Sequence, residues 1–143
     1  MRYLTRDFGE IEIEGEQIIN FSQPIFGFDT YLQYAILHDP DVGMDVSWLQ
    51  SLDESDLCFV LVSPDAVSQD YRPQFPTGLH EMIGEGEYEF WLIAVIQEDF
   101  TKSTVNLKSP VVVNWKTGLG AQVILDGDYP VRRPLIEDTE GVC

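Results

Sequence analysis

Apolar and polar residues alternate with a period of two along much of this 143-residue chain, a pattern typical of β-strands with one solvated face. In residues 9–16, GEIEIEGE, Ile11 and Ile13 alternate with glutamates. Other apolar stretches bounded by turn-forming residues predict further strands. These stretches are 17–23, a segment through Ile36 and Leu37, 44–52, 56–64, 87–96, two strands within 104–125 and an edge segment within 128–136.

The one stretch with a helical pattern is 76–84, PTGLHEMIG, with Thr77 as the predicted N-cap and Gly84 at the C-terminal end. Seven or more short strands predict an all-β, mainly antiparallel fold: a small closed or nearly closed β-barrel or sandwich with one or two short helices. Closure would remove exposed strand edges from a chain rich in Val, Ile and Phe. At this length we expect a single domain spanning residues 1–143.

Charge is distributed very unevenly. The chain has a net charge of −17, while residues 101–125 carry three lysines and no acid, which leaves −20 on the other 118 residues. Because phosphate neutralisation supplies much of the affinity for nucleic acids, we expect no direct binding of RNA or DNA. Such a field attracts basic partners and speeds their encounter. The plainer explanation is that the acids only keep the protein soluble.

Candidate catalytic and metal-binding motifs fail on inspection. HEMIG at 80–84 begins like a zinc-protease helix, but Gly84 stands where the second histidine ligand is needed. We expect His80 to be a surface helix residue. Cys58 lies within an apolar strand, where burial would leave it inert. KTGLG at 116–120 is predicted to be a hairpin turn, because no helix follows that could hold phosphate. These motifs therefore argue against an enzyme.

The expected location is the cytoplasm. The N-terminus reaches acidic residues at once and lacks the apolar core of a signal peptide. The two cysteines, Cys58 and Cys143, do not make a disulfide framework. The chain contains no run of 18 apolar residues, so we expect no membrane partner.

Several segments resemble the FliW family of flagellar assembly factors, in the family's order and spacing and over nearly the whole chain. These are FGEIEIE (8–14), FSQPIFGFD (21–29), WLQSLDESDLCFVLVSP (48–64), VNLKSPVVVNWKTGLGAQVIL (105–125) and YPVRRPL (129–135). One loop and one residue depart from the family pattern. Its usual Pro-x-Gly-Leu-Pro-Gly-Phe loop corresponds here to Ser22 through Phe28, and Arg133 stands where a histidine is often found.

The resemblance implies a small β-barrel-like domain without a cofactor that binds other proteins. FliW-like proteins bind CsrA, a small basic RNA-binding translational repressor, and relieve its block on flagellin synthesis. They also bind flagellin itself, so that free flagellin releases CsrA. A partner that must hold RNA is basic, which gives the −17 charge a specific use.

The acid-free hairpin is the predicted partner-binding surface. Flagellin's assembly segments are amphipathic helices, which bind through apolar grooves, and an acid-free strand pair forms such a groove without desolvating a carboxylate. The residues predicted to touch a partner or shape its groove are Asn106, Leu107, Pro110, Asn114 and Gln122, with Gln50 on the same face as Trp48. Asn106 and Gln122 are expected to face solvent. Val111, Val113, Val123 and Leu125 are expected to be core, and so is Trp48.

A second predicted site is the acid-dense turn that contains Asp53, Glu54 and Asp56. We expect this turn to be solvated and to attract the basic partner through its field, so that charge reversal there would slow association without unfolding the domain. The irregular crossing at 64–76 is the next choice for a flagellin contact.

Two alternatives from other classes remain open. One is a barrel that holds a small apolar ligand, because 17 aromatic residues could line a cavity. The other is an enzyme that uses a carboxylate pair, which would show a bell-shaped pH–rate profile.

Overall fold

The computed structural model describes residues 2–6, 8–38, 45–67, 71, 73, 75, 78–95, 98 and 102–134. Its elements, in chain order, are β1 (Arg2–Thr5), β2 (Gly9–Glu12), the 3₁₀-helix η1 (Gly15–Gln17), β3 (Ile19–Gln23), β4 (Gln33–Leu37), β5 (Val46–Ser51), β6 (Cys58–Val62), α1 (Pro64–Val67), α2 (Leu79–Ile83), β7 (Glu89–Val95), β8 (Thr104–Val105), β9 (Val111–Asn114), β10 (Leu119–Gln122) and β11 (Arg133–Pro134). Across the described residues, no helix is long and apolar enough to cross a membrane.

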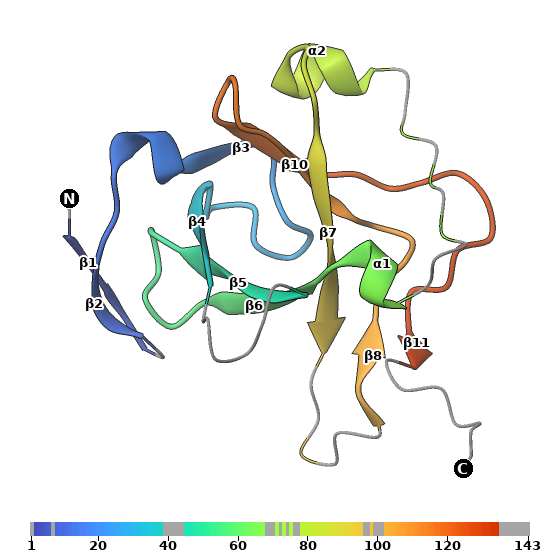
Figure 1. Ribbon diagram of the computed structural model, residues 1–143, viewed down its shortest axis with the longest axis horizontal. Helices are drawn as coiled ribbons and strands as arrows, with labels where there is room; N and C mark the ends of the chain where they lie inside the picture. The colour runs from blue at the N-terminus through green and yellow to red at the C-terminus, as the bar shows by residue number, and fades with distance from the viewer. Residues whose placement is uncertain are drawn as a thin grey trace.

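Seven of the strands close into a barrel, in the order β3-β4-β5-β6-β7-β9-β10 and back to β3 (Figure 1). The pairs are antiparallel except for β3 with β10, which is parallel. That parallel pair contains a register shift between Gly120 and Ala121. The predicted all-β, mainly antiparallel barrel with short helices is therefore confirmed.

Strand β7 links the closed barrel to two short strands outside it, β8 and β11. Its first half, Glu89 to Trp91, pairs with β9, and its second half, Ala94 and Val95, pairs with β8. Strand β8 in turn pairs with β11, which is the predicted edge segment. In Figure 1, β7 runs downward from near α2 at the top and ends beside β8. One end of β7 therefore lies beside α2 and the β9–β10 hairpin.

Two apolar clusters form the core, and both include residues of β9. One cluster contains Val111 and Val113 together with Trp91, and the other contains Val112 together with Leu79 and other residues. Because side chains alternate along a strand, both faces of β9 are covered. All three valines have no exposed surface.

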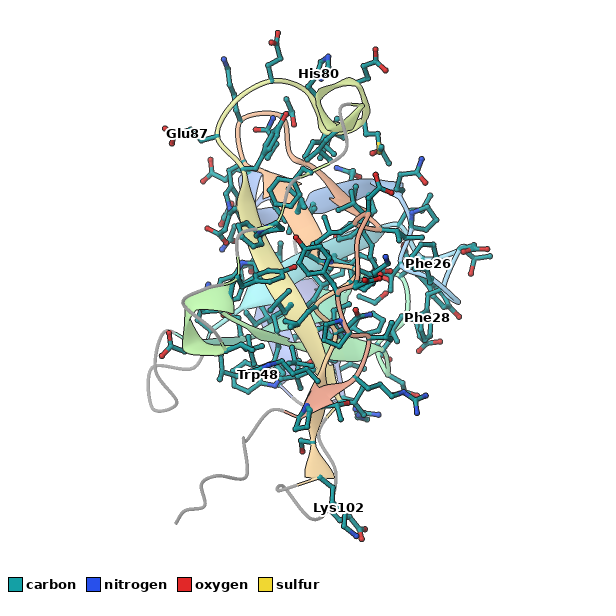
Figure 2. The ribbon with its side chains drawn as sticks, turned by 90° about the vertical axis from the view of Figure 1, so that its right-hand side faces the viewer. Phe26, Phe28, Trp48, His80, Glu87 and Lys102 are labelled. Carbon is teal, nitrogen blue, oxygen red and sulfur yellow. The ribbon has the colours of Figure 1, made fainter. Side chains whose placement is uncertain are left out.

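The helical prediction is confirmed over Leu79–Ile83, with Gly84 at its end. Its N-cap residue is Gly78, and the predicted N-cap Thr77 lies outside the described residues. Leu79 and Ile83 are buried, whereas His80 is exposed, as expected. The helix therefore covers the core with one face and leaves the other in solvent (Figure 2).

Tyr71, within the predicted irregular crossing, is a core residue. It is 7% exposed, and its hydroxyl donates a 2.7 Å hydrogen bond to the carbonyl of Leu107. Burial, followed by the nearby Tyr129, raises the pKa of the Tyr71 phenol well above its usual value. This part of the crossing contributes packing, because a buried aromatic with a satisfied hydroxyl stabilises the fold.

The N-terminal strands β1 and β2 form a separate two-stranded sheet with an exposed alternation, as the GEIEIEGE pattern predicts. Arg6 and Phe8 both contact the barrel. The N–H of Arg6 donates to the carbonyl of Ser55 at 3.1 Å, and the ring of Phe8 packs edge-on against Trp48 at 5.5 Å. Trp48 was expected in the core and is half-buried. Cys58, expected to be buried, is also half-buried.

Candidate partner-binding site

The hairpin predicted to carry the site is largely buried. Leu107, Asn114 and Gln122 are at most 7% exposed, Pro110 is buried and Asn106 is half-buried. The expectation that Gln122 faces solvent is therefore wrong, and Asn106 faces solvent only in part. The alternating pattern predicts that one face of this hairpin lies in solvent. In the structure, the two apolar clusters and α2 cover both faces instead. The predicted core positions Val111, Val113, Val123 and Leu125 are buried, as expected.

Asn106 and Gln122 use their side chains inside the molecule. The Asn106 carboxamide oxygen accepts the N–H groups of Lys108 and Ser109 at 2.9 and 3.0 Å. The Gln122 amide accepts the N–H of Phe26 at 2.9 Å and donates to the carbonyl of Ser109 at 3.2 Å. Gln122 thereby holds the loop of Phe26 against the hairpin. In this conformation these polar groups shape neighbouring loops, and a direct contact with a partner stays a prediction.

Asn114 fastens the β9–β10 turn to α2. Its amide nitrogen donates to the carbonyls of Ile83 and Glu85 at 3.0 and 3.2 Å, and its oxygen accepts the N–H of Lys116 at 3.0 Å. The hydroxyl of Thr117 also donates to the Ile83 carbonyl, at 2.7 Å. Buried polar groups that are fully paired rigidify the segment that carries them. Asn114 therefore positions the turn, although it has no exposed surface for a partner.

That turn spans residues 115–118 and confirms the prediction that KTGLG lies in a hairpin. Gly118 adopts a φ of 76°, a conformation that favours glycine at the end of such a turn. Trp115 and Lys116 project from the turn, and Trp115 is 42% exposed. A tryptophan with this much exposed ring is available to another molecule.

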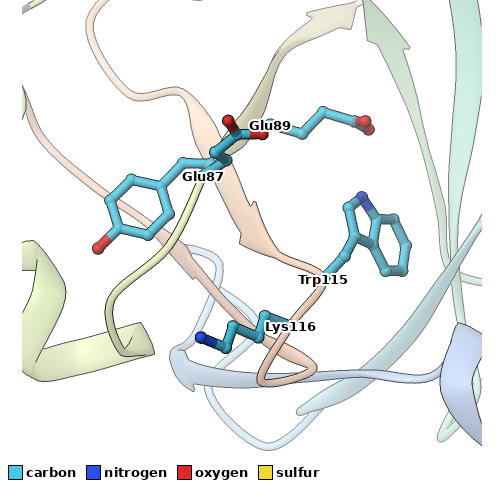
Figure 3. Close-up of a pocket in the computed structure, with 5 residues that line it drawn as sticks. Glu87, Glu89, Trp115 and Lys116 are labelled. Atoms are coloured by element: carbon cyan, nitrogen blue, oxygen red, sulfur yellow. The ribbon is translucent and has the colours of Figure 1, made fainter.

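A surface depression of about 470 Å³ lies between this turn and the start of β7. It is lined by Glu87, Tyr88, Glu89, Trp115 and Lys116, which Figure 3 shows on the two neighbouring segments. A second depression, of about 320 Å³, adjoins it, because Tyr88 and Glu89 line both. The second depression continues along Phe90 and Trp91 to Ser63 and Pro64 at the start of α1.

The walls of the first depression are braced by hydrogen bonds. The Tyr88 hydroxyl donates to the Gly84 carbonyl at 2.6 Å, and the Trp91 indole N–H donates to the Glu89 carboxylate at 2.6 Å. The Asn114 and Thr117 bonds hold the opposite wall. The sequence reasoning missed Glu87, Glu89 and Trp115, because their proximity depends on the β7–β9 register. The signal in the sequence that could have indicated this site was Trp115, a tryptophan within a polar turn.

The acid-dense turn is exposed but also organised. Asp53 and Asp56 are exposed and Glu54 is half-buried. The Asp53 carboxylate accepts the N–H groups of Leu32 and Gln33 at 2.8 and 3.0 Å, so it anchors the start of β4. Asp53 therefore positions a neighbouring strand in addition to contributing charge. A carboxylate can satisfy backbone donors of a neighbouring segment even when it lies in solvent.

Gln50, also predicted to bind a partner, contacts the same turn from its buried side. It has no exposed surface, and its amide nitrogen donates to the carbonyls of Ser51, Ser55 and Leu57. In this turn Asp56 is the acid best suited to charge reversal, since Glu54 accepts the N–H of Asp56 at 3.1 Å and Asp53 anchors β4.

Comparison with known proteins agrees with this architecture. The family model described as FliW protein matches residues 2–135. A flagellar assembly factor FliW from Ruminiclostridium cellulolyticum is 36% identical over 141 residues, covering 95% of each chain. One from Lachnoclostridium phytofermentans is 36% identical over 139 residues, covering 93% of this chain and 89% of that protein.

A crystal structure of the flagellar assembly factor FliW superimposes with a TM-score of 0.88 at 28% sequence identity, covering 99% of this chain and all of that one. The fold and the sequence agree over almost the full length. This chain belongs to the FliW family of flagellar assembly factors.

Proposed function

We propose that this protein regulates flagellin synthesis in the cytoplasm by binding proteins, without a cofactor. It binds a basic RNA-binding translational repressor of the CsrA type, and it binds flagellin in exchange for that repressor. The observation that carries the proposal is an acidic surface on a FliW-family barrel. Fifteen of the sixteen acidic side chains whose burial the structure describes are exposed, the exception being the half-buried Glu54.

The exposed acids support the repressor as the first partner. A repressor that holds RNA needs a basic surface, and a protein of net charge −17 attracts it over several ångströms of solvent. The same charge repels RNA, so the repressor would be bound in preference to its RNA target. Complementary charge also raises the association rate more than it slows dissociation.

Exposed apolar side chains support flagellin as the second partner. Phe26, Ile124 and Trp115 are 54%, 53% and 42% exposed. An amphipathic helix binds through apolar anchors of this kind. The buried hairpin residues would then act by holding these anchors, as Gln122 holds the loop of Phe26.

The test is a binding experiment with the purified chain, the CsrA-type repressor and flagellin from the same organism. We expect a complex with each protein, displacement of the repressor by flagellin, and no complex of the chain alone with flagellin leader RNA. Association with the repressor should slow as salt rises from about 50 to about 500 mM. Asp56→Lys should slow association in the same way, and Asp56→Asn should have a smaller effect.

Failure to bind either protein at about 10 μM would contradict the proposal, and so would a salt-sensitive complex with the RNA alone.

The alternative of a small-ligand barrel predicts a retained molecule in a native mass spectrum. Both apolar clusters are filled with side chains such as Leu49, Leu61, Val111 and Val112, which have no exposed surface.

A further inference from the structure

The register of β7 and β9 brings two carboxylates and a tryptophan to one face. Glu89 is directly opposite Val113 in this antiparallel pair. Residues two positions further along each strand point to the same face, so Glu87 and Trp115 lie together beyond the last pair. All three side chains, Glu87, Glu89 and Trp115, line the 470 Å³ depression.

The fourth charged residue of the depression points elsewhere. In Figure 3, Lys116 and Trp115 leave the turn in opposite directions. Within the described part of the chain, Glu87 and Glu89 form no ion pair. The Trp115 side of the depression therefore carries two negative charges without a matching positive charge among the described residues.

Glu89 is held in place before any partner arrives. One oxygen of its carboxylate accepts the Trp91 indole N–H at 2.6 Å. The bond orients the carboxylate, so less side-chain entropy is lost when a cation binds. The Asn114 bonds to Ile83 and Glu85 hold the turn of Trp115 relative to the opposite wall.

We propose that this depression binds an arginine side chain of the basic repressor, with the guanidinium stacked on Trp115 and paired with Glu87 and Glu89. The identity of the partner rests on the proposed function, whereas the guanidinium site rests on the depression itself. An indole face attracts a cation through its quadrupole. Arginine fits better than lysine because its planar guanidinium can stack and donate to carboxylates at the same time.

The first test needs no repressor. The protein is labelled with ¹⁵N, and the indole N–H signal of Trp115 is assigned by its loss in Trp115→Phe. The probe is the capped tripeptide acetyl-Gly-Arg-Gly-amide, and the control is the same peptide with citrulline, which has arginine's shape without its charge. We expect the arginine peptide alone to shift the Trp115 signal, with saturation in the millimolar range, and the double variant Glu87→Gln/Glu89→Gln to abolish the shift.

The second test uses the purified repressor. Glu87→Gln/Glu89→Gln should weaken binding by about tenfold or more, because two charge-assisted contacts are lost. Asp126→Asn/Asp128→Asn removes the same charge from exposed positions outside the depression, and should weaken binding by less than about threefold. Trp115→Leu should weaken binding of the repressor by about tenfold, whereas Trp115→Phe should keep most of the affinity.

A double-mutant cycle then identifies the arginine. One Arg→Gln substitution in the repressor should weaken its binding to the wild-type chain. The same substitution should not weaken its binding to the Glu87→Gln/Glu89→Gln chain. Equal shifts of the Trp115 signal with both peptides would overturn the inference, and so would equal affinity losses for the two charge-matched double variants. If the arginine peptide binds but the repressor does not, the guanidinium site stands and the proposed function fails.

Discussion

The two hairpins β1–β2 and β9–β10 are of similar length, yet they differ in charge and in burial. The first carries Glu10 and Glu12 on exposed positions, and Leu4 is 70% exposed. The second has no acid, and every residue of β9 is buried. The N-terminal hairpin touches the barrel on one side, whereas β9 lies between two apolar clusters.

This difference explains the acid-free stretch at 101–125. We expected it to provide an apolar groove for a partner. The structure gives a simpler physical reason: β9 and its flanks contribute to both clusters, and a carboxylate placed there would lose its hydration without a partner. Folding therefore accounts for the absence of acids from the buried positions of this stretch. The surface available to partners lies at the end of this hairpin, where Trp115 leaves the core.

The largest effect is expected from Asn114→Ala. The substitution leaves the carbonyls of Ile83 and Glu85 without the amide that now pairs with them. Each buried group left unsatisfied costs about 1–3 kcal/mol, which the Thr117 hydroxyl offsets in part at Ile83. Urea denaturation should show a large loss in the free energy of unfolding. Asn20→Ala, at an exposed asparagine of β3, is the matched control and should stay within about 0.5 kcal/mol of wild type.

Val113→Ala tests the packing side of the comparison. Val113 has no exposed surface, so truncation leaves a cavity and should lower the free energy of unfolding by about 1–3 kcal/mol. Leu4→Ala removes a larger apolar group from the exposed hairpin and should change it by less than about 0.5 kcal/mol. If the two variants have the same urea midpoint, the hairpins do not differ in packing as described.

Alkaline pH should destabilise the barrel through Tyr34. Burial, followed by the charges of Asp53 and Tyr31, raises the pKa of Tyr34 to about 12. Between about pH 10 and about pH 12 the unfolded chain loses this proton while the folded chain keeps it, so stability falls as pH rises, by at most about 1.4 kcal/mol per pH unit. Stability from this group is fully present below about pH 10.

Tyr34→Phe should flatten that alkaline slope in urea denaturation curves. Within the described residues, the Tyr34 hydroxyl is buried without a hydrogen-bond partner, so the substitution should also leave stability at pH 7 unchanged or slightly raised. An unchanged slope in Tyr34→Phe would show that other groups govern the alkaline limb.

The smallest effect is expected from Arg2→Ala. Arg2 pairs with Glu10 at 3.2 Å and Glu12 at 3.5 Å, and its side chain is 71% exposed. Exposed pairs of this kind are screened by salt and contribute little. The urea midpoint should not shift measurably, although amide hydrogen exchange within β1 and β2 should become faster at low salt. A shift as large as that of Val113→Ala would mean that the hairpin is integral to the barrel.

The sequence alone determined most of the strand content, the position of α2 and the membership of the FliW family. It also predicted a hairpin within 104–125, but the hairpin spans only Val111–Gln122, and Thr104–Val105 form β8, which pairs with β7 and β11. These features depend on local patterns: alternation of apolar residues, turn-forming residues, and motifs that stay in order along the chain. The location of charge is also local, because acids can be counted without knowing the fold.

Only the tertiary structure decided which side chains face solvent. An alternating strand predicts two faces but not what covers each of them, so Gln122 and Asn114 could be assigned to the surface although both are buried. The meeting of Glu87 and Glu89 with Trp115 depends on the pairing of β7 with β9, strands separated by fifteen residues. A shift of one residue in that register would turn these side chains to the other face, and no local pattern specifies it.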